Sequence, residues 1–310
     1  MGEPAVSIVI PTQRRPAALE TAIRSTFNQA GVDVARLELV VVDNDERPSA
    51  KALVAALSSE APFPVTYVHE ASPGVATARN AALRKARGDF IAFLDDDEEA
   101  PAGWLAALLA DQAKFDGDVV FGPVRGRAPA DIRKHRAYLE RFFSRVGPEQ
   151  AGLTEEYYGC GDSLIRRAAL PDQCQPFSER HNQIGGEDTI LFAAMKAAGA
   201  RFVWSPNAWV WEDPSPQRLN LRYTIVRAFA YGQGPSSACA AADPPDRLGV
   251  MKWMGVGAVQ ALGFSALAAL QALMGARQTA FTLDRAVRGL GKVFWWGPFK
   301  VRFYGHRSSP

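Results

Sequence analysis

Short runs of β-branched and other apolar residues alternate with longer amphipathic segments through the first 125 residues of the chain. Such alternation predicts βαβ units around a mostly parallel sheet. The run at 37–42 is apolar almost throughout, as expected for a parallel strand covered on both faces. The predicted strands are 6–10, 37–42, 65–68, 90–94 and 119–124, and the predicted helices are 16–27, 50–57, 76–86 and 104–115.

The pattern becomes less regular after residue 125. Residues 130–145 predict a basic amphipathic helix, and 157–168 predict a strand or hairpin. We therefore expect 1–125 and 126–245 to form the two halves of one domain, with 246–310 as a separate helical region.

The last part of the chain has a different composition. Trp253 to Met274 is a run of 22 residues without a charge, which approaches the roughly 20 residues that span a bilayer. Its alanines and glycines make it less hydrophobic than a typical spanning helix, so a membrane span and a buried or interfacial helix both stay open. Beyond it, 294–304 mixes aromatic and basic residues, a composition typical of a membrane interface. The alternative is that these aromatic rings cover a core.

Charge is distributed unevenly, although the formal net charge is only +2. Residues 249–310 contain eight basic residues against Asp284 alone, a local charge of +7, so the remainder of the chain carries −5. The basic end suits an anionic cytoplasmic leaflet, and no nucleic-acid-binding signature accompanies it, so we expect no nucleic-acid partner. Three cysteines without CxxC spacing predict neither a disulfide framework nor a zinc site, and a reducing cytoplasm is expected. The N-terminus has no signal-peptide pattern.

Five acidic residues, Asp95 to Glu99, follow the predicted strand at 90–94. Such a run is usually a solvated surface, but ligands bind at the carboxyl ends of strands in open α/β sheets. Two carboxylates about 4 Å apart repel by about 4 kcal/mol at an effective dielectric near 20, so a fixed cluster needs a cation. Asp95 and Asp97 point to one side of an extended segment. The run therefore predicts a site for Mg²⁺ or Mn²⁺, whose shell is completed by substrate phosphates.

Three other places carry candidate chemistry. Asp43 ends a predicted strand, where it would cap a turn with Asn44 or bind a base or ribose. Arg79 would be a surface cation or a ligand of a diphosphate. The segment 185–188, Gly-Gly-Glu-Asp, would begin a helix or supply a base for an incoming hydroxyl group. Neither a G-x-G-x-x-G nor a P-loop motif occurs, which argues against dinucleotide and P-loop sites.

Taken together, these motifs resemble the family 2 glycosyltransferases of the GT-A fold. The matching segments are "SIVIPTQRRPAALETAIRSTFNQ", "LVVVDND", "PGVATARNAALRKARGDFIAFLDDD" and "GGEDTILFAAMKAAGARFVWSP", which occur in the family's order and spacing over roughly residues 5–230. Within the family, "VWEDPSPQRLNLRYTIVRAFAYG" and "RGLGKVFWWGPFKVRFYG" are most similar to bacterial exopolysaccharide transferases of the succinoglycan glucosyltransferase type.

The resemblance implies an α/β fold of GT-A type, with a single mixed, mostly parallel Rossmann-like sheet flanked by helices and a C-terminal membrane-associating helical segment. Residues 1–125 would bind the sugar nucleotide, 126–245 would face the acceptor, and 246–310 would associate with the membrane. The implied reaction is inverting transfer of a hexose, with a UDP-sugar expected as donor and a polyprenyl-diphosphate-linked oligosaccharide as acceptor. It would take place at the cytoplasmic face of the inner membrane, beside other polysaccharide-assembly proteins.

Residue roles follow from the same resemblance. Asp97 would be the direct metal ligand with Asp95 as a second, and Asp95 or Asp96 would lie on the ribose side. Asp188, next to Glu187, would be the catalytic base. Where many relatives have histidine, this chain has Trp211-Glu212-Asp213. The implied donor-binding set is Pro11, Thr12, Arg14, Asp43, Arg79, Asn80, Asp95, Asp96 and Asp97, and the candidate acceptor or diphosphate contacts are Trp211, Glu212 and Arg218.

Two alternatives remain open from the sequence. A sugar nucleotidylyltransferase also combines an α/β sheet with a metal and a nucleotide, but it would consume a nucleoside triphosphate and release diphosphate. A membrane-bound scaffold or sugar-binding subunit would retain the fold without turnover, against which the presence of Asp43, Asp97 and Asp188 argues.

Overall fold

The computed structural model describes residues 5–182 and 186–301. Within these ranges the chain forms two compact units, 5–125 with 144–213 and 126–143 with 214–301. The boundary between the units at 213 differs from the division expected at 245, because helix α7 (Leu221–Ala241) packs with the helices that follow it. The assignment of 1–245 to one catalytic domain stays a prediction.

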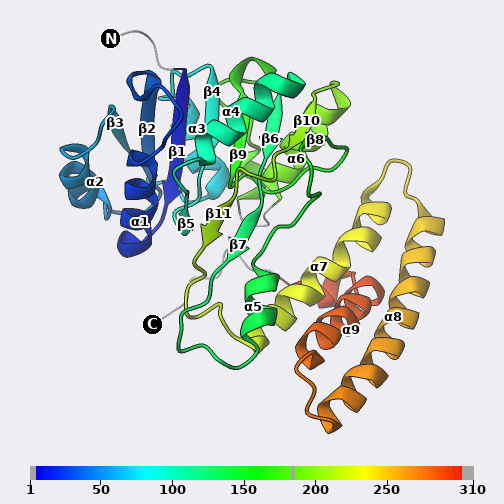
Figure 1. The fold of residues 1–310 in the computed structure, drawn as a ribbon. Coiled ribbons are helices and arrows are strands. Elements are labelled where there is room, and N and C mark those ends of the chain that lie inside the picture. Colours follow the sequence, from blue (N-terminus) through cyan, green and yellow to red (C-terminus); the bar gives the residue numbers. More distant parts are fainter. Residues whose placement is uncertain (1–4, 183–185, 302–310) are drawn as a thin grey trace. The chain divides into compact units, whose positions relative to one another are not determined.

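An eight-stranded mixed sheet forms the centre of the first unit (Figure 1). The strand order is β3-β2-β1-β4-β9-β6-β10-β8, in which β9 and β8 run against the other six strands. The sheet is therefore mostly parallel, as expected. The strands are β1 Val6–Thr12, β2 Leu37–Asp43, β3 Val65–His69, β4 Phe90–Phe93, β6 Val119–Phe121, β8 Gly152–Leu153, β9 Ser163–Arg166 and β10 Phe202–Trp204.

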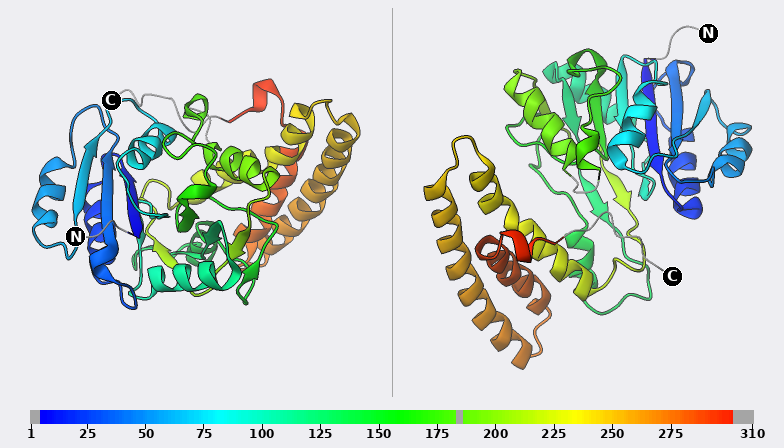
Figure 2. Two further views of the ribbon diagram at one scale, coloured as in Figure 1. Left: turned by 90° about the horizontal axis from the view of Figure 1, so that it is seen from above. Right: turned by 180° about the vertical axis from the view of Figure 1, so that it is seen from behind.

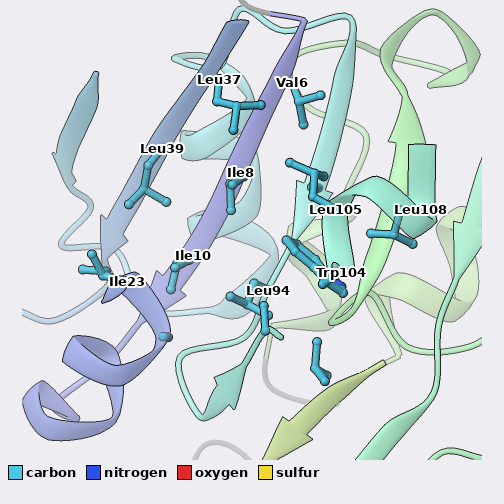
Figure 3. Packing of buried hydrophobic residues seen from close by; sticks show 14 of the residues in the cluster. Val6, Ile8, Ile10, Ile23, Leu37, Leu39, Leu94, Trp104, Leu105 and Leu108 are labelled. Atoms are coloured by element: carbon cyan, nitrogen blue, oxygen red, sulfur yellow. The ribbon is translucent and has the colours of Figure 1, made fainter. Parts of the chain in front are cut away.

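Helices cover both faces of this sheet, because successive residues of its central strands are apolar and point to opposite sides. One core contains Ile8 and Ile10 of β1 with residues of α1 (Pro16–Phe27) and α4 (Trp104–Phe115) (Figure 3). Residues of α2 (Lys51–Ser58) belong to the same core. The other contains Val9 of β1 with residues of α3 (Val75–Leu83) and α6 (Glu187–Ala197). The expectation that the strand at 37–42 is covered on both faces is confirmed, since every residue of β2 is buried.

The strand predicted at 119–124 is in fact two strands in different sheets. It breaks at Gly122, where a Cβ atom would overlap the carbonyl oxygen of Ala208, and at Pro123, which has no N–H to donate. After the break, β7 (Val124–Gly126) joins β5 (Glu98–Glu99) and β11 (Val210–Glu212) in a three-stranded sheet of order β5-β11-β7.

Two further predictions are corrected by the structure. The helix expected over 130–145 is limited to α5 (Arg136–Phe142), which begins after His135 in a left-handed conformation with φ of 59°. The strand or hairpin expected over 157–168 supplies one strand, β9, which inserts antiparallel between β4 and β6. Its antiparallel direction, together with that of β8, makes the sheet mixed.

The second unit is helical within the described residues. It contains α5, α7, α8 (Arg247–Leu273) and α9 (Thr279–Val293), and α9 packs against both α7 and α8 (Figure 2). Helix α8 is long and apolar enough to cross a membrane, with a mean hydropathy of 1.6 and only 17% of its apolar window buried. This helix is compatible with membrane association. The part of the aromatic and basic segment beyond Val301 lies outside the described residues.

Candidate active site

Polar residues distant in sequence converge where β1, β2 and β4 end. Strands β1 and β2 are parallel and in register, so that Thr12 lies opposite Asp43. The backbone N–H of Leu94, just after β4, donates to the carbonyl of Val9 on β1. Across this edge the Thr12 hydroxyl donates to Oδ2 of Asp96 at 2.8 Å. The acidic run therefore lies at the carboxyl edge of the parallel strands, where open α/β sheets bind ligands.

Arg15 neutralises part of the acidic run. It precedes helix α1, and its Nη1 donates to Oδ1 of Asp96 and to Oδ2 of Asp97, both at 2.9 Å. Burial raises the pKa of Asp96 to about 6, although the nearby Arg15 opposes this shift. Arg15 was not among the candidates from the sequence. The sequence shows only that Arg15 is a cation just after the first strand. Such a residue could equally lie at the binding site or on the surface.

Asp95 is held by the buried carboxylate of Glu98, a residue of the acidic run that was not among the candidate ligands. The Asp95 N–H donates to Oε2 of Glu98 at 2.8 Å, and the Glu98 N–H donates to the Asp95 carbonyl at 3.0 Å. Burial, together with the carboxylates of Asp95 and Asp162, raises the pKa of Glu98 well above its ordinary range. These two hydrogen bonds between Glu98 and Asp95 fix the backbone at the start of the acidic run.

Asp162 completes this support. It is fully buried, accepts from the indole Nε1 of Trp104 at 2.7 Å and lies 3.3 Å from Nη2 of Arg145. Burial raises its pKa to about 7, with Arg145 as the main opposing influence. In the sequence these residues lie in unrelated segments, so only the tertiary structure brings them together.

Arg79 is a buried cation next to Asp95 of the acidic run. It is buried, and its Nη1 donates to Oε1 of Glu187 at 2.7 Å, while its Nη2 lies 3.6 Å from Oδ1 of Asp95. The guanidinium group also lies over the rings of Phe93 and Phe177, at 6.0 and 5.6 Å. Burial raises the pKa of Glu187, an effect that Arg79 opposes. The pair thus connects α3 to α6, and the Glu187 carboxylate is engaged in this internal ion pair.

Asp188, the expected base, lies beside the segment 159–161. Its Oδ2 accepts from the N–H of Cys160 at 3.4 Å. On the same segment, a Cβ atom at Gly161 would come within 2.5 Å of Oδ2 of Asp95. One short stretch of backbone therefore contacts both the expected base and the acidic run. Gly185, which precedes this pair in the sequence motif, lies outside the described residues.

Asp43 and Asn80 have their polar atoms engaged inside the protein. The buried Asp43 carboxylate accepts from the N–H of Ala50 at 2.7 Å and from the Tyr67 hydroxyl at 2.8 Å. The Asn80 amide donates to the carbonyl of Phe177 and accepts from its N–H. These contacts organise the loops around the site, and direct donor contacts from Asp43 and Asn80 stay predictions.

A small hollow lies at the end of β1. Arg14 lines it, together with Thr12 and Arg15 on one side and Ser49 and Ala50 on the other. Arg14 has a left-handed φ of 57° and forms an ion pair with Asp45 at 2.6 Å. Pro16 and Leu19 complete the lining, and both arginines are already paired with carboxylates, Arg14 with Asp45 and Arg15 with the acidic run. Pro11 is half-buried on the same strand.

The Trp211-Glu212-Asp213 segment lies beside the acidic run. Trp211 is opposite Glu99 in the β5–β11 pair, and the Asp213 N–H donates to the carbonyl of Asp97 at 2.8 Å. The Trp211 ring lies edge-on to Trp209, with 5.1 Å between the ring centroids. Arg218 belongs to the second unit, where it lies over the ring of Phe143 at 4.9 Å.

Asp95 and Asp97 are suitable ligands for a hard cation. In the part of the chain that the structure describes, no group of three acidic, histidine or cysteine side chains converges closely enough to hold a metal by itself. Mg²⁺ and Mn²⁺ need only one or two carboxylates when water and substrate phosphates complete the shell. The Asp95 side chain is 40% exposed and so can reach a ligand at this edge. The residues present therefore fit a cation that is shared with a diphosphate.

Known proteins resemble this chain in sequence. The model of Glycosyl transferase family 2 matches residues 7–172. Succinoglycan biosynthesis protein ExoM of Rhizobium meliloti is 38% identical over 229 residues, which make up 74% of this chain and 73% of that protein. The GalNAc(5)-diNAcBac-PP-undecaprenol beta-1,3-glucosyltransferase of Campylobacter jejuni is 33% identical over 107 residues, 34% of each chain.

Solved structures share the fold at low sequence identity. The mannosyltransferase PcManGT from Pyrobaculum calidifontis, in complex with GDP-Man and Mn²⁺, has a TM-score of 0.59 at 19% identity and covers 95% of this chain and 88% of its own. S. aureus TarS 1-349 in complex with UDP has a TM-score of 0.52 at 17% identity, with coverages of 93% and 90%. The expected GT-A class, a mixed sheet flanked by helices, is confirmed.

Proposed function

Since the chain belongs to glycosyl transferase family 2, we propose that it moves a hexose from a UDP-sugar to an acceptor hydroxyl group, with inversion at the anomeric carbon. It is a glycosyltransferase, and its fold neighbours include complexes with UDP and with GDP-Man. The observation that carries the proposal is the segment 159–161, which contacts Asp188 on one side and Asp95 on the other. This arrangement supports a proton acceptor placed close to the donor-binding edge.

In the proposed mechanism the acidic run binds the donor. Asp97 and Asp95 would hold Mg²⁺ or Mn²⁺, which when bound offsets negative charge on the departing nucleoside diphosphate. Arg15 orients the Asp97 carboxylate, and the Arg79 guanidinium lies 3.6 Å from that of Asp95. Thr12 holds the neighbouring Asp96. Preorganised charges of this kind stabilise the transition state because they need no rearrangement during the reaction.

Asp188 would act on the acceptor. Its carboxylate takes the proton of the acceptor hydroxyl while the hydroxyl oxygen attacks the anomeric carbon, and the bond from that carbon to the diphosphate breaks on the opposite face. A new glycosidic bond of inverted configuration results. Glu187 remains paired with Arg79 and positions Asp188 through the start of helix α6.

The acceptor is proposed to be a polyprenyl-diphosphate-linked oligosaccharide at the cytoplasmic face of the membrane, where other polysaccharide-assembly proteins would act. Two relatives support this by name, one in succinoglycan biosynthesis and one acting on an undecaprenol-linked glycan. Trp211 and Glu212 are proposed to contact the acceptor because they lie beside the acidic run. The apolar helix α8 supports membrane association.

Replacement of the base tests the mechanism. Asp188→Asn should lower transfer by about 10²–10⁴-fold while leaving UDP-sugar affinity unchanged. The matched control is Asp33→Asn, an exposed carboxylate that accepts the N–H of Ala35 and should leave both quantities unchanged. Near-normal turnover of Asp188→Asn would remove Asp188 from the proposed role. Release of inorganic diphosphate from a nucleoside triphosphate, instead of UDP from a UDP-sugar, would identify a nucleotidylyltransferase.

A further inference from the structure

Helix α8 exposes a row of large apolar side chains on one face and buries small residues on the opposite face, while Trp253 and Phe264 between them are half-buried. An outward stripe consists of Leu248, Met251, Val259, Leu262, Leu270 and Leu273, which are between 54% and 87% exposed. Their spacing of three, four or a multiple of these places them on one face of the helix. Gly257, Ala261 and Ala268 lie on the opposite face and are buried. A helix in a water-soluble bundle shows the reverse pattern, whereas small residues at helix contacts are typical of membrane proteins.

The inward face of α8 is fixed to α9. A Cβ atom at Gly257 would come within 2.6 Å of the Gly289 carbonyl oxygen, and one at Gly289 within 2.7 Å of the backbone nitrogen of Ala261. Gln260, at the midpoint of α8, donates to the Arg285 carbonyl and accepts from Lys292 at 2.9 Å. The two backbones are therefore in direct contact around the middle of α8.

This packing places charged residues beside the middle of α8. Helix α9 contains Asp284, Arg285, Arg288 and Lys292 in its 15 residues, which make it about 22 Å long. If α8 crossed a bilayer, its midpoint would lie in the hydrocarbon centre, and α9 would bring these charges there with it. Charged side chains are rare at that depth, and a helix of this length is too short to span.

The order of charges along the chain points the same way. After α8, the described residues contain Arg277, Arg285, Arg288, Lys292 and Lys300 against Asp284 alone. If α8 crossed from the cytoplasm, Arg277 would lie on the far side of the membrane, and the basic residues of α9 would lie within the membrane beside α8. Membrane proteins keep basic segments of this kind on the cytoplasmic side.

We propose that α8 lies in the plane of the membrane and does not cross it, with its outward stripe in the boundary between headgroups and acyl chains of an anionic bilayer. This inference rests on the membrane association proposed above. Arg247 and Lys252 at the start of α8, and Arg277 after its end, are exposed and can contact anionic headgroups. Lys252 lies on the same face as the stripe, where its flexible stem can extend to the headgroups.

Sided labelling of the full chain tests this orientation. In a background with Cys174→Ser and Cys239→Ser, single cysteines are introduced as Ala242→Cys before α8 and Arg277→Cys after it, since the native Cys160 is buried. A membrane-impermeant maleimide should label both sites in inverted inner-membrane vesicles and neither in spheroplasts. Labelling of Arg277→Cys only in spheroplasts would overturn the in-plane orientation and leave membrane association intact. Recovery of the chain wholly in the soluble fraction would overturn both.

Vesicle binding identifies what covers the stripe. Purified full-length protein with Leu262→Ser should bind vesicles of phosphatidylglycerol and phosphatidylcholine about tenfold more weakly than the parent protein. Leu153→Ser, at a 60% exposed leucine of the first unit, is the matched control and should bind normally. Equal binding of the parent to pure phosphatidylcholine would overturn the anionic preference. A lipid-free dimer that Leu262→Ser dissociates, with no loss of vesicle binding, would make a second copy the partner instead.

Discussion

The buried ion pair between Arg79 and Glu187 allows a quantitative prediction. Both side chains are only 6% exposed, and at 2.7 Å their attraction is about 6 kcal/mol at an effective dielectric near 20. Most of this attraction offsets the cost of removing both charges from water. Arg79→Met would leave the Glu187 carboxylate buried without its cation, so we expect the free energy of unfolding to fall by about 3–5 kcal/mol. The double variant Arg79→Met with Glu187→Gln should lose about 1–3 kcal/mol less than the sum of the two single-variant losses, and this difference is the coupling energy.

Urea denaturation of the parent, both single variants and the double variant measures this coupling. The matched control is the Arg24–Glu60 pair, which has the same 2.7 Å separation but side chains 45% and 52% exposed. Solvent screens that pair, so Arg24→Met should have a much smaller effect. Strictly additive effects at Arg79 and Glu187, or equal effects of Arg24→Met and Arg79→Met, would refute the reasoning that burial gives the inner pair its importance.

Three further predictions concern pH, metal and acceptor. The raised pKa of Asp162 means that the folded state keeps a proton that the unfolded state releases near pH 4, so stability should fall as pH rises from about 4 to about 7. Asp162→Asn should flatten that part of the profile in urea titrations, and an unchanged slope would contradict the assignment. Asp97→Asn should weaken Mn²⁺ binding in the presence of UDP by at least about tenfold in calorimetry, unlike Asp33→Asn. Trp211→Ala should raise the KM for the acceptor without changing UDP affinity in steady-state kinetics, and the opposite outcome would place Trp211 on the donor side.

The sequence predicted the donor-facing half of the sheet well, for a physical reason. Strands β1 to β4 alternate with helices, and their apolar periodicity is a local property that needs no knowledge of the rest of the fold. The acidic run could be placed at a strand end on the same grounds. Its place beside Thr12 followed from parallel pairing, since the carboxyl ends of neighbouring strands meet at one edge.

The supporting contacts could not be predicted, because they join distant segments. Trp104 and Asp162 are 58 residues apart, and Arg79 and Glu187 are 108 apart. The sequence left Arg79 open as a surface cation or a diphosphate ligand, and no local pattern predicts its burial against Glu187 and Asp95. Its place near the diphosphate stays a prediction. The second sheet was also missed, because strands of two or three residues such as β5 are too short to show a period.

The place of β9 in the sheet has a consequence for how the chain is synthesised. Strand β4 ends at Phe93, but the neighbour on its open side is Ser163–Arg166, and β6 is attached to the sheet through that same strand. While the ribosome makes the roughly 70 intervening residues, about 4–14 s at ordinary elongation rates, the nascent sheet exposes an unpaired edge. Unpaired edges pair readily with other chains, so this interval is when a nascent chain most needs a chaperone. Strand β4, which leads into the acidic run, thus gains its second neighbouring strand only after more than half of the chain has been synthesised.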